Sequence, residues 1–137
     1  LSRDPAPHNQ SNFNIKKKQV YKSAREKAYI QELELRLRAK IVKDKTFKRY
    51  GETPIKVEYI FGFQPPKSWS KKKQQQALNH DIYPTAQNLG DWDNLTKSTQ
   101  DRLNKLVIAD DRFIVDGRAR KVYMAKPYLR IEIEEMR

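Results

Sequence analysis

Residues 91–116 constrain this chain most, because they concentrate acidic side chains in a protein that is otherwise strongly basic. The stretch reads DWDNLTKSTQDRLNKLVIADDRFIVD and holds five aspartates within its first 21 positions. Carboxylates this dense repel one another and cost stability, unless a cation lies among them or they take part in chemistry. We therefore expect the fold to be built around a use for these aspartates.

A helix is predicted to begin at the first two aspartates and to run to about residue 106. Gly90 breaks any preceding structure, and Asp91 or Asp93 can cap the helix. One side of this helix is mostly apolar and is expected to pack on the body of the domain. The opposite side carries carboxylate, amide and ammonium groups in line, which is typical of a site: Asp93, Asn94, Lys97, Asp101 and Asn104.

A second acidic pair, Asp110 and Asp111, stands just before a segment with the β-branched and aromatic content of a strand. Mg²⁺ takes oxygen ligands and is held by a few carboxylates together with water and substrate phosphate. Asp91, Asp93 and one of the second pair meet that need. An ion held in this way lowers the pKa of a bound water and neutralises charge on a phosphate under attack.

Each part of this pattern also has a plain structural interpretation. A D-x-D pair occurs in caps and turns, and two adjacent aspartates occur in loop turns. Lys97 on its own is typical of a solvated lysine that pairs with Asp93 or Asp101 one helical turn away. The joint pattern is far more restrictive than any one of its parts.

The joint pattern resembles the signature of the RusA family of Holliday junction resolvases. The resemblance extends over nearly the whole chain, and residues 91–121 carry its specific part. The residues that carry it are Asp91, Trp92, Asp93, Asn94, Leu95, Thr96, Lys97, Asp101, Leu103, Asn104, Asp110, Asp111, Ile114, Val115, Asp116 and Lys121, with weaker similarity over residues 5–13 and 66–73.

This resemblance implies a small homodimeric endonuclease that depends on Mg²⁺, with Mn²⁺ as an alternative, and nicks paired strands at four-way DNA junctions. It implies that Asp91, Asp93 and Asp111 hold the metal and that Lys97 assists catalysis. Supporting roles fall on Asn94, Asp101 and Asp110. The spacing to the second acidic pair is shorter here than in the best-known member, so Asp110 also stays a candidate ligand.

The net charge of +12 indicates a polyanionic partner. Residues 1–90 hold 19 Lys and Arg against 8 Asp and Glu, whereas residues 91–137 hold 10 against 9. Basic charge alone also suits RNA, ribosomes or anionic lipid. The residues predicted to contact DNA are Lys16, Lys17, Lys18, Lys71, Lys72, Lys73, Arg118, Arg120 and Lys121.

Other classes of protein are disfavoured by composition. The chain contains no cysteine, so it has no disulfide or thiolate metal site, which fits a reducing cytoplasm. The resemblance implies a bacterial host cell, where the protein would act at the nucleoid. No apolar run reaches the length of a membrane span. Two histidines and four glycines leave no Ser/His/Asp or Cys/His set and no glycine-rich phosphate loop. These absences favour a mechanism that relies on metal alone.

The first half of the chain predicts a helix, a strand and a second helix. Residues 21–43 lack Gly and Pro and have apolar side chains at helical spacing, with Ser23 and Glu26 as a capping box. Residues 55–63 alternate and then become wholly apolar, which predicts a strand that starts half exposed and becomes buried. Ser68 is the predicted N-cap of a short helix that ends near residue 78.

The second half predicts a mobile loop over residues 79–90 beside the aspartates, and then two strands after the helix. The first strand covers residues 112–124 with a bulge at Gly117, and the second covers residues 129–134. We expect these two strands to form a hairpin-like pair.

Residues 1–19 are predicted to form an irregular basic arm, with one short strand near residues 12–15 and with His8 as an ordinary exposed histidine. The whole chain, residues 1–137, is then one α+β domain with helices packed on a small mixed sheet.

Two other functions stay open at this point. A nucleic-acid-binding module without catalysis explains the charge but leaves the aspartates idle. A metal-dependent phosphatase or transferase for a small phosphorylated substrate explains the D-x-D pair but not the basic first 90 residues.

Overall fold

The computed structural model describes residues 1–8, 13–14, 19–20 and 24–136. It is an α+β fold with a small mixed sheet, as predicted. Its elements in chain order are β1 (Phe13–Asn14), β2 (Gln19–Val20), α1 (Ala24–Lys43), β3 (Ile55–Phe63), α2 (Lys71–Leu78), the 3-10 helix η1 (Gln87–Leu89), α3 (Trp92–Leu103), the 3-10 helix η2 (Asp111–Phe113), β4 (Ile114–Tyr123) and β5 (Tyr128–Glu135).

The main sheet has the strand order β4-β3-β5, with β4 parallel and β5 antiparallel to β3. The predicted hairpin between β4 and β5 is therefore wrong, because both strands pair with β3 and not with each other. β3 is the most buried strand, with Val57, Phe61 and Phe63 fully inaccessible to solvent. A neighbouring strand on each side satisfies the backbone hydrogen bonds of an apolar strand such as β3 and keeps it buried. The parallel pairing with β4 is possible because the long crossover through α2 and α3 returns the chain to the same end of the sheet.

Gly62 is where the connection from β4 to β5 passes over the end of β3. A Cβ atom on Gly62 would lie 2.6 Å from Met124 Cγ and 2.6 Å from Tyr128 Cβ. Since any side chain would block this approach, the absence of one is what lets the chain cross there.

The bulge predicted at Gly117 lies elsewhere. Gly117 pairs regularly with Val57, and the register shift falls at Val115, between the pairs of Ile55 and Lys56. Val115 is the extra residue where the chain leaves the tight turn of η2, and its side chain is 62% exposed.

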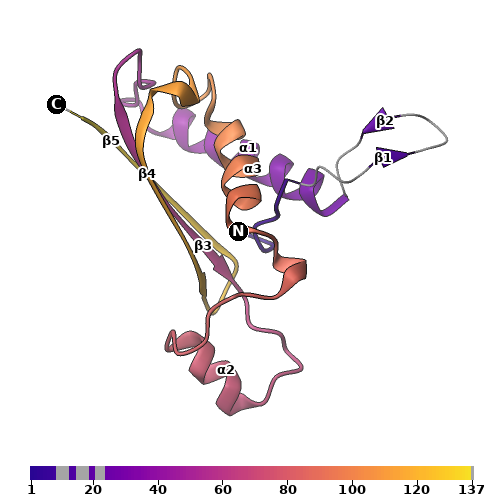
Figure 1. Cartoon of the computed structure of the whole chain (residues 1–137). Coiled ribbons are helices and arrows are strands. Elements are labelled where there is room, and N and C mark those ends of the chain that lie inside the picture. Colours follow the sequence, from indigo (N-terminus) through magenta and orange to yellow (C-terminus); the bar gives the residue numbers. More distant parts are fainter. Residues whose placement is uncertain (9–12, 15–18, 21–23, 137) are drawn as a thin grey trace.

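α1 and α3 lie side by side on one face of the sheet, and α2 projects beyond the ends of the strands (Figure 1). The apolar side predicted for α3 is confirmed, because Leu95, Thr99 and Leu103 are buried. Thr99 Oγ1 lies 2.6 Å from the Tyr29 hydroxyl of α1, so the two helices share a buried hydrogen bond. α3 ends at Leu103, earlier than predicted, because Asn104 leaves the helical conformation (ψ 128°) and Lys105 follows in a left-handed one (φ 68°).

Residues 1–8 are irregular, as predicted, but part of this segment packs into the domain. Pro5 and Ala6 are fully buried, because small apolar residues fit between α1 and α3. Ser98 Oγ of α3 donates a 2.6 Å hydrogen bond to Ala6 O. His8 Nδ1 lies 3.0 Å from Glu26 Oε1, so the prediction of an ordinary exposed histidine is wrong. The other half of the predicted capping box, Ser23, lies outside the described residues, as do parts of the predicted strand near residues 12–15.

α2 begins two residues later than predicted, because its N-cap is Ser70 and not Ser68. Ser70 Oγ accepts a 3.2 Å hydrogen bond from Lys73 N, whereas the backbone N–H of Trp69 still donates to Pro66 O in the preceding turn. In the part of the chain that the structure describes, no helix combines the length and apolar character needed to cross a membrane.

Candidate active site

The first two aspartates stand at the N-terminal end of α3 and both are exposed. Asp91 occupies the N-cap position, but its side chain makes no capping hydrogen bond. Asp93 Oδ1 accepts a 3.0 Å hydrogen bond from Asn94 N. Each carboxylate therefore keeps oxygen lone pairs that face solvent, at the end of a helix whose dipole attracts negative charge.

The backbone just before these aspartates is fixed from two sides. Gly90 has φ +98°, and a Cβ atom there would lie 2.5 Å from Pro7 Cβ, so this position requires glycine. From the other side, Lys121 Nζ of β4 donates a 3.2 Å hydrogen bond to Gly90 O. Trp92 Nε1 donates a 2.8 Å hydrogen bond to Ala119 O of the same strand. The loop that carries Asp91 is thus held against β4 and against residues 1–8.

Lys97 lies on the exposed side of α3, with its Nζ 3.7 Å from Asp101 Oδ2. This is the plain pairing that the sequence allowed. The lysine side chain is 50% exposed, and an ion pair of this kind in solvent contributes little stability. The ammonium can therefore leave Asp101 for a phosphate at small cost.

The second acidic pair stands at the other end of α3. Asp111 Oδ2 accepts a 3.4 Å hydrogen bond from Asn104 Nδ2. Burial, followed by the charges of Tyr29, Asp111 and Asp101, raises the pKa of the Tyr59 hydroxyl, which donates a 3.2 Å hydrogen bond to Gln100 Oε1. Asp101, Asn104 and Asp111 therefore belong to a polar cluster at the C-terminal end of α3.

Asp110 has a local task. Its Oδ1 accepts a 3.2 Å hydrogen bond from Arg112 N, capping η2, and this bond is the main reason that the pKa of Asp110 is lowered. Asp111, by contrast, faces α3. Between the two candidates, the side chain available for a site on α3 is Asp111.

Within one copy of the chain, Asp111 is far from Asp91 and Asp93. Leu103 lies ten positions after Asp93, and a helix rises about 1.5 Å per residue, so the two ends of α3 are about 15 Å apart. In agreement, no three Asp, Glu, His or Cys side chains gather closely enough to hold a metal ion among the residues described. Near Asp111, Asn104 Oδ1 is buried and has no hydrogen-bond partner in the described part of the chain.

The predicted DNA-contacting lysines of α2, Lys71, Lys72 and Lys73, are all exposed. Lys73 Nζ lies 4.1 Å from the centroid of the Trp69 ring, and Trp69 packs edge-on against Tyr123 at 5.5 Å. The aromatic pair thus fixes one lysine at the end of the sheet. Lys16, Lys17 and Lys18 lie outside the described residues.

Arg118 and Arg120 share one face of β4, as predicted, where they pair in register with Glu58 and Ile60. Both are exposed, and by strand alternation they lie on the face opposite the one on which Val57 and Phe61 are buried. Lys121 points to the other face, where it binds Gly90 O beside the first aspartates. DNA contact by these residues stays a prediction.

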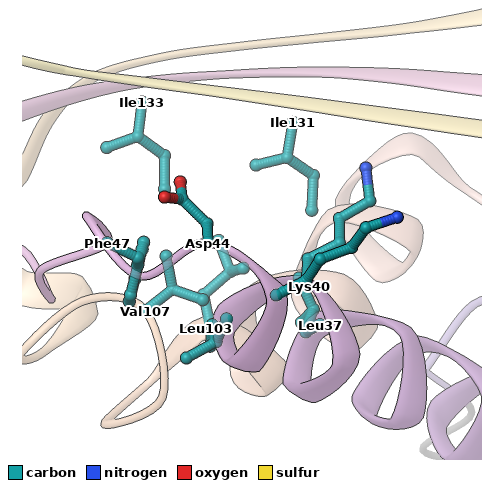
Figure 2. A pocket seen from close by; sticks show the side chains of 10 residues that line it. Leu37, Lys40, Asp44, Phe47, Leu103, Val107, Ile131 and Ile133 are labelled. Atoms are coloured by element: carbon teal, nitrogen blue, oxygen red, sulfur yellow. The ribbon is translucent and has the colours of Figure 1, made fainter.

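An apolar hollow of about 550 Å³ lies apart from this chemistry, between the second half of α1 and β5. Figure 2 shows Ile131 and Ile133 facing Leu37, Leu103 and Val107 across it. None of the predicted site residues lines it.

Two features of the aspartate region were missed in the sequence. One is the role of Trp92, whose signal is an aromatic residue between two aspartates at the start of a helix. The other is the hydrogen bond of Lys121 to Gly90, which depends on the packing of β4 against the start of α3. The sequence has no local signal for that packing.

A model of the family described as endodeoxyribonuclease RusA matches residues 3–134 of this chain. A search of curated proteins finds no match.

Proposed function

The chain belongs to the RusA endodeoxyribonuclease family, and we propose that it acts as a Mg²⁺-dependent homodimer that resolves four-way DNA junctions by paired nicks. The observation that carries the proposal is the pair of exposed aspartates at the start of α3, with uncommitted oxygens, inside a protein of net charge +12. A basic surface binds the DNA backbone, and hard oxygen donors suit Mg²⁺ or Mn²⁺.

Asp91 and Asp93 would hold the ion, with Asp111 as the third carboxylate. When bound, such an ion supplies Lewis-acid activation of water and neutralises charge on the scissile phosphate. Lys97 would leave Asp101 to stabilise charge that develops on that phosphate. Asn94 and Asp101 would orient the aspartates and the lysine, and Asp110 would fix the turn that presents Asp111.

A second copy of the chain would bring the third carboxylate to the other two. Asp111 bonds to Asn104 at the C-terminal end of α3, about 15 Å from the end that carries Asp93, and within one copy this is too far for the two to share an ion. β4 is an edge strand, and it carries Asp111 just before one end and Lys121, bound to Gly90, near the other. A two-fold partner placed along this edge would set Asp111 of one copy beside the first aspartates of the other.

This arrangement also accounts for two details near Asp111. Val115, the second residue of β4, is 62% exposed, and Asn104 Oδ1 beside Asp111 has no partner among the residues described. A partner chain along β4 would cover the valine and bring polar groups to the amide. Two sites related by a two-fold axis match a junction of two-fold symmetry, so each would cut one of two opposed strands.

The experiment that tests the proposal uses a synthetic four-way junction, with Mg²⁺ or with a chelator. The wild type is compared with Asp93→Asn and with a matched control, Glu135→Gln, which neutralises an exposed carboxylate at the end of β5. We expect paired nicks from the wild type and the control in Mg²⁺ only. Asp93→Asn should bind the junction without cutting it.

Nicking that persists in the chelator would rule out the metal mechanism. Undiminished cutting by Asp93→Asn would favour the non-catalytic role of the aspartates. If binding to the junction does not weaken steeply as the salt concentration rises, a small phosphorylated substrate is favoured instead.

A further inference from the structure

Trp92 is an exposed aromatic ring between the two aspartates proposed to hold the ion. It is the first residue of α3, and in a single copy of the chain 48% of it is open to solvent. Tryptophan is highly buried on average, because exposing its ring leaves a large apolar surface in water. The exposure of this one therefore needs a reason.

The ring is held in place from several directions. Its Nε1 donates a 2.8 Å hydrogen bond to Ala119 O, so its only polar group already has a partner. Its backbone carbonyl accepts a 2.8 Å hydrogen bond from Thr96 Oγ1, and the preceding residue is fixed by Lys121. What Trp92 offers to solvent is therefore a rigid π surface, which loses little conformational entropy when another ring stacks on it.

The surroundings of the ring attract nucleic acid. Asp91 and Asp93 flank it in sequence, so a nucleotide on the ring lies next to the proposed ion. Arg118 and Arg120 flank Ala119 in the sequence, and their exposed side chains lie on the other face of β4, around the strand edge from the indole. Aromatic rings in basic surroundings bind single-stranded bases by stacking, whatever their sequence.

We infer that Trp92 stacks on a base at the branch point of the junction and thereby selects the phosphate next to that base for cleavage. In a continuous duplex each base is covered on both faces by its neighbours, so the ring finds no free face. Where strands exchange, stacking is interrupted and a face becomes available. This inference rests on the proposed function and adds to it the residue that distinguishes branched from linear DNA.

The test compares Trp92→Ala and Trp92→Phe with the wild type, on a four-way junction and on a linear duplex of the same sequence. 2-Aminopurine is placed either at the branch point or within one arm. Leu35→Ala serves as a matched control, because it removes an exposed apolar side chain from α1, away from the aspartates. Binding, kcat and KM are measured with each substrate.

We expect binding of the wild type to quench the branch-point probe and to leave the arm probe unchanged. Trp92→Ala should lose that quenching and lose about tenfold in kcat/KM on the junction, the effect of one stacked base. Its binding to linear duplex should not change. Trp92→Phe should keep most of both effects, and Leu35→Ala should match the wild type.

Three results would overturn the inference. Trp92→Ala could keep the quenching and the junction preference, or weaken junction and linear duplex equally. It could also dissociate the dimer in light scattering, which would make Trp92 a contact between copies. A wild type that cuts junctions while Trp92→Ala behaves normally removes this inference alone, whereas a wild type that does not cut junctions removes the proposed function with it.

Discussion

Tyr29 and Tyr59 keep their hydroxyl groups inside the domain, and this makes stability depend on alkaline pH. Burial is the main cause that raises the pKa of both above the ordinary value of 10.0. A raised pKa in the folded state means that stability is complete below the unfolded pKa and is lost as pH rises beyond it. We expect the urea midpoint to be level up to about pH 9 and to fall steeply above about pH 10.

The fall should be shallower in Tyr29→Phe and in Tyr59→Phe, which remove one buried titrating group each. Tyr29→Phe also loses the hydrogen bond to Thr99, at a cost of about 1 kcal/mol. The quantity to compare is therefore the slope of the urea midpoint against pH, not the midpoint itself. Tyr83→Phe is the control, because Tyr83 is 58% exposed. An unchanged slope in both buried variants would show that other groups govern alkaline unfolding.

At the residue scale, the sequence shows which side chains stand out, but it does not show which of them meet in the fold. The aspartates, Asn94 and Lys97 stand out by type and spacing alone. Their partners depend on how distant segments pack. Asp111 reaches Asn104, and Pro7 lies against Gly90, only because β4 and residues 1–8 are folded against α3.

Gly62 gives the clearest prediction for an element, the crossing of the β4–β5 connection over β3. Gly62→Ala would place a Cβ atom 2.6 Å from both Met124 and Tyr128, and the connection would have to move. We expect a loss of about 1–3 kcal/mol in the free energy of unfolding, measured with urea. Gly51→Ala is the matched control, because its Cβ meets nothing within 4 Å, and it should change stability by less than about 1 kcal/mol. Equal effects of the two changes would contradict the crossing.

The bounds of an element are predicted well, because they depend on a local periodicity in the sequence. The partners of a strand are predicted poorly, because they depend on contacts between distant segments. β3 has the bounds that its alternation predicted, Ile55–Phe63. The pairing of β4 and β5 was wrong, because neighbouring strands usually form hairpins, whereas here burial of β3 decides the order. Burial of Pro5 and Ala6 was missed for a similar reason, since short apolar segments carry no period.

Binding of the whole molecule to DNA should depend on where its positive charge lies. We expect the logarithm of the affinity for a junction to fall linearly with the logarithm of salt concentration, with a slope of about 0.9 per phosphate contact. Replacing Lys71, Lys72 and Lys73 with Gln should weaken binding and reduce that slope. The control replaces Lys43, Lys45 and Lys48, which are also exposed, so the net charge falls equally. Identical losses in both triple variants would mean that only net charge matters and that α2 makes no specific contact.

The composite site predicts that two inactive subunits can restore activity to each other. Asp93→Asn and Asp111→Asn should each abolish cutting. If Asp111 completes the site of the partner, a mixed dimer carries both changes in one site and none in the other. Random mixing then leaves about a quarter of all sites intact, with at most one in each dimer. On a supercoiled cruciform plasmid we expect single nicks without paired cuts.

Asp91→Asn mixed with Asp93→Asn is the control and should recover no activity, because both changes fall in the same half of the site. If the first mixture also stays inactive, each subunit must build its site from its own three aspartates, and α3 would have to rearrange on binding DNA.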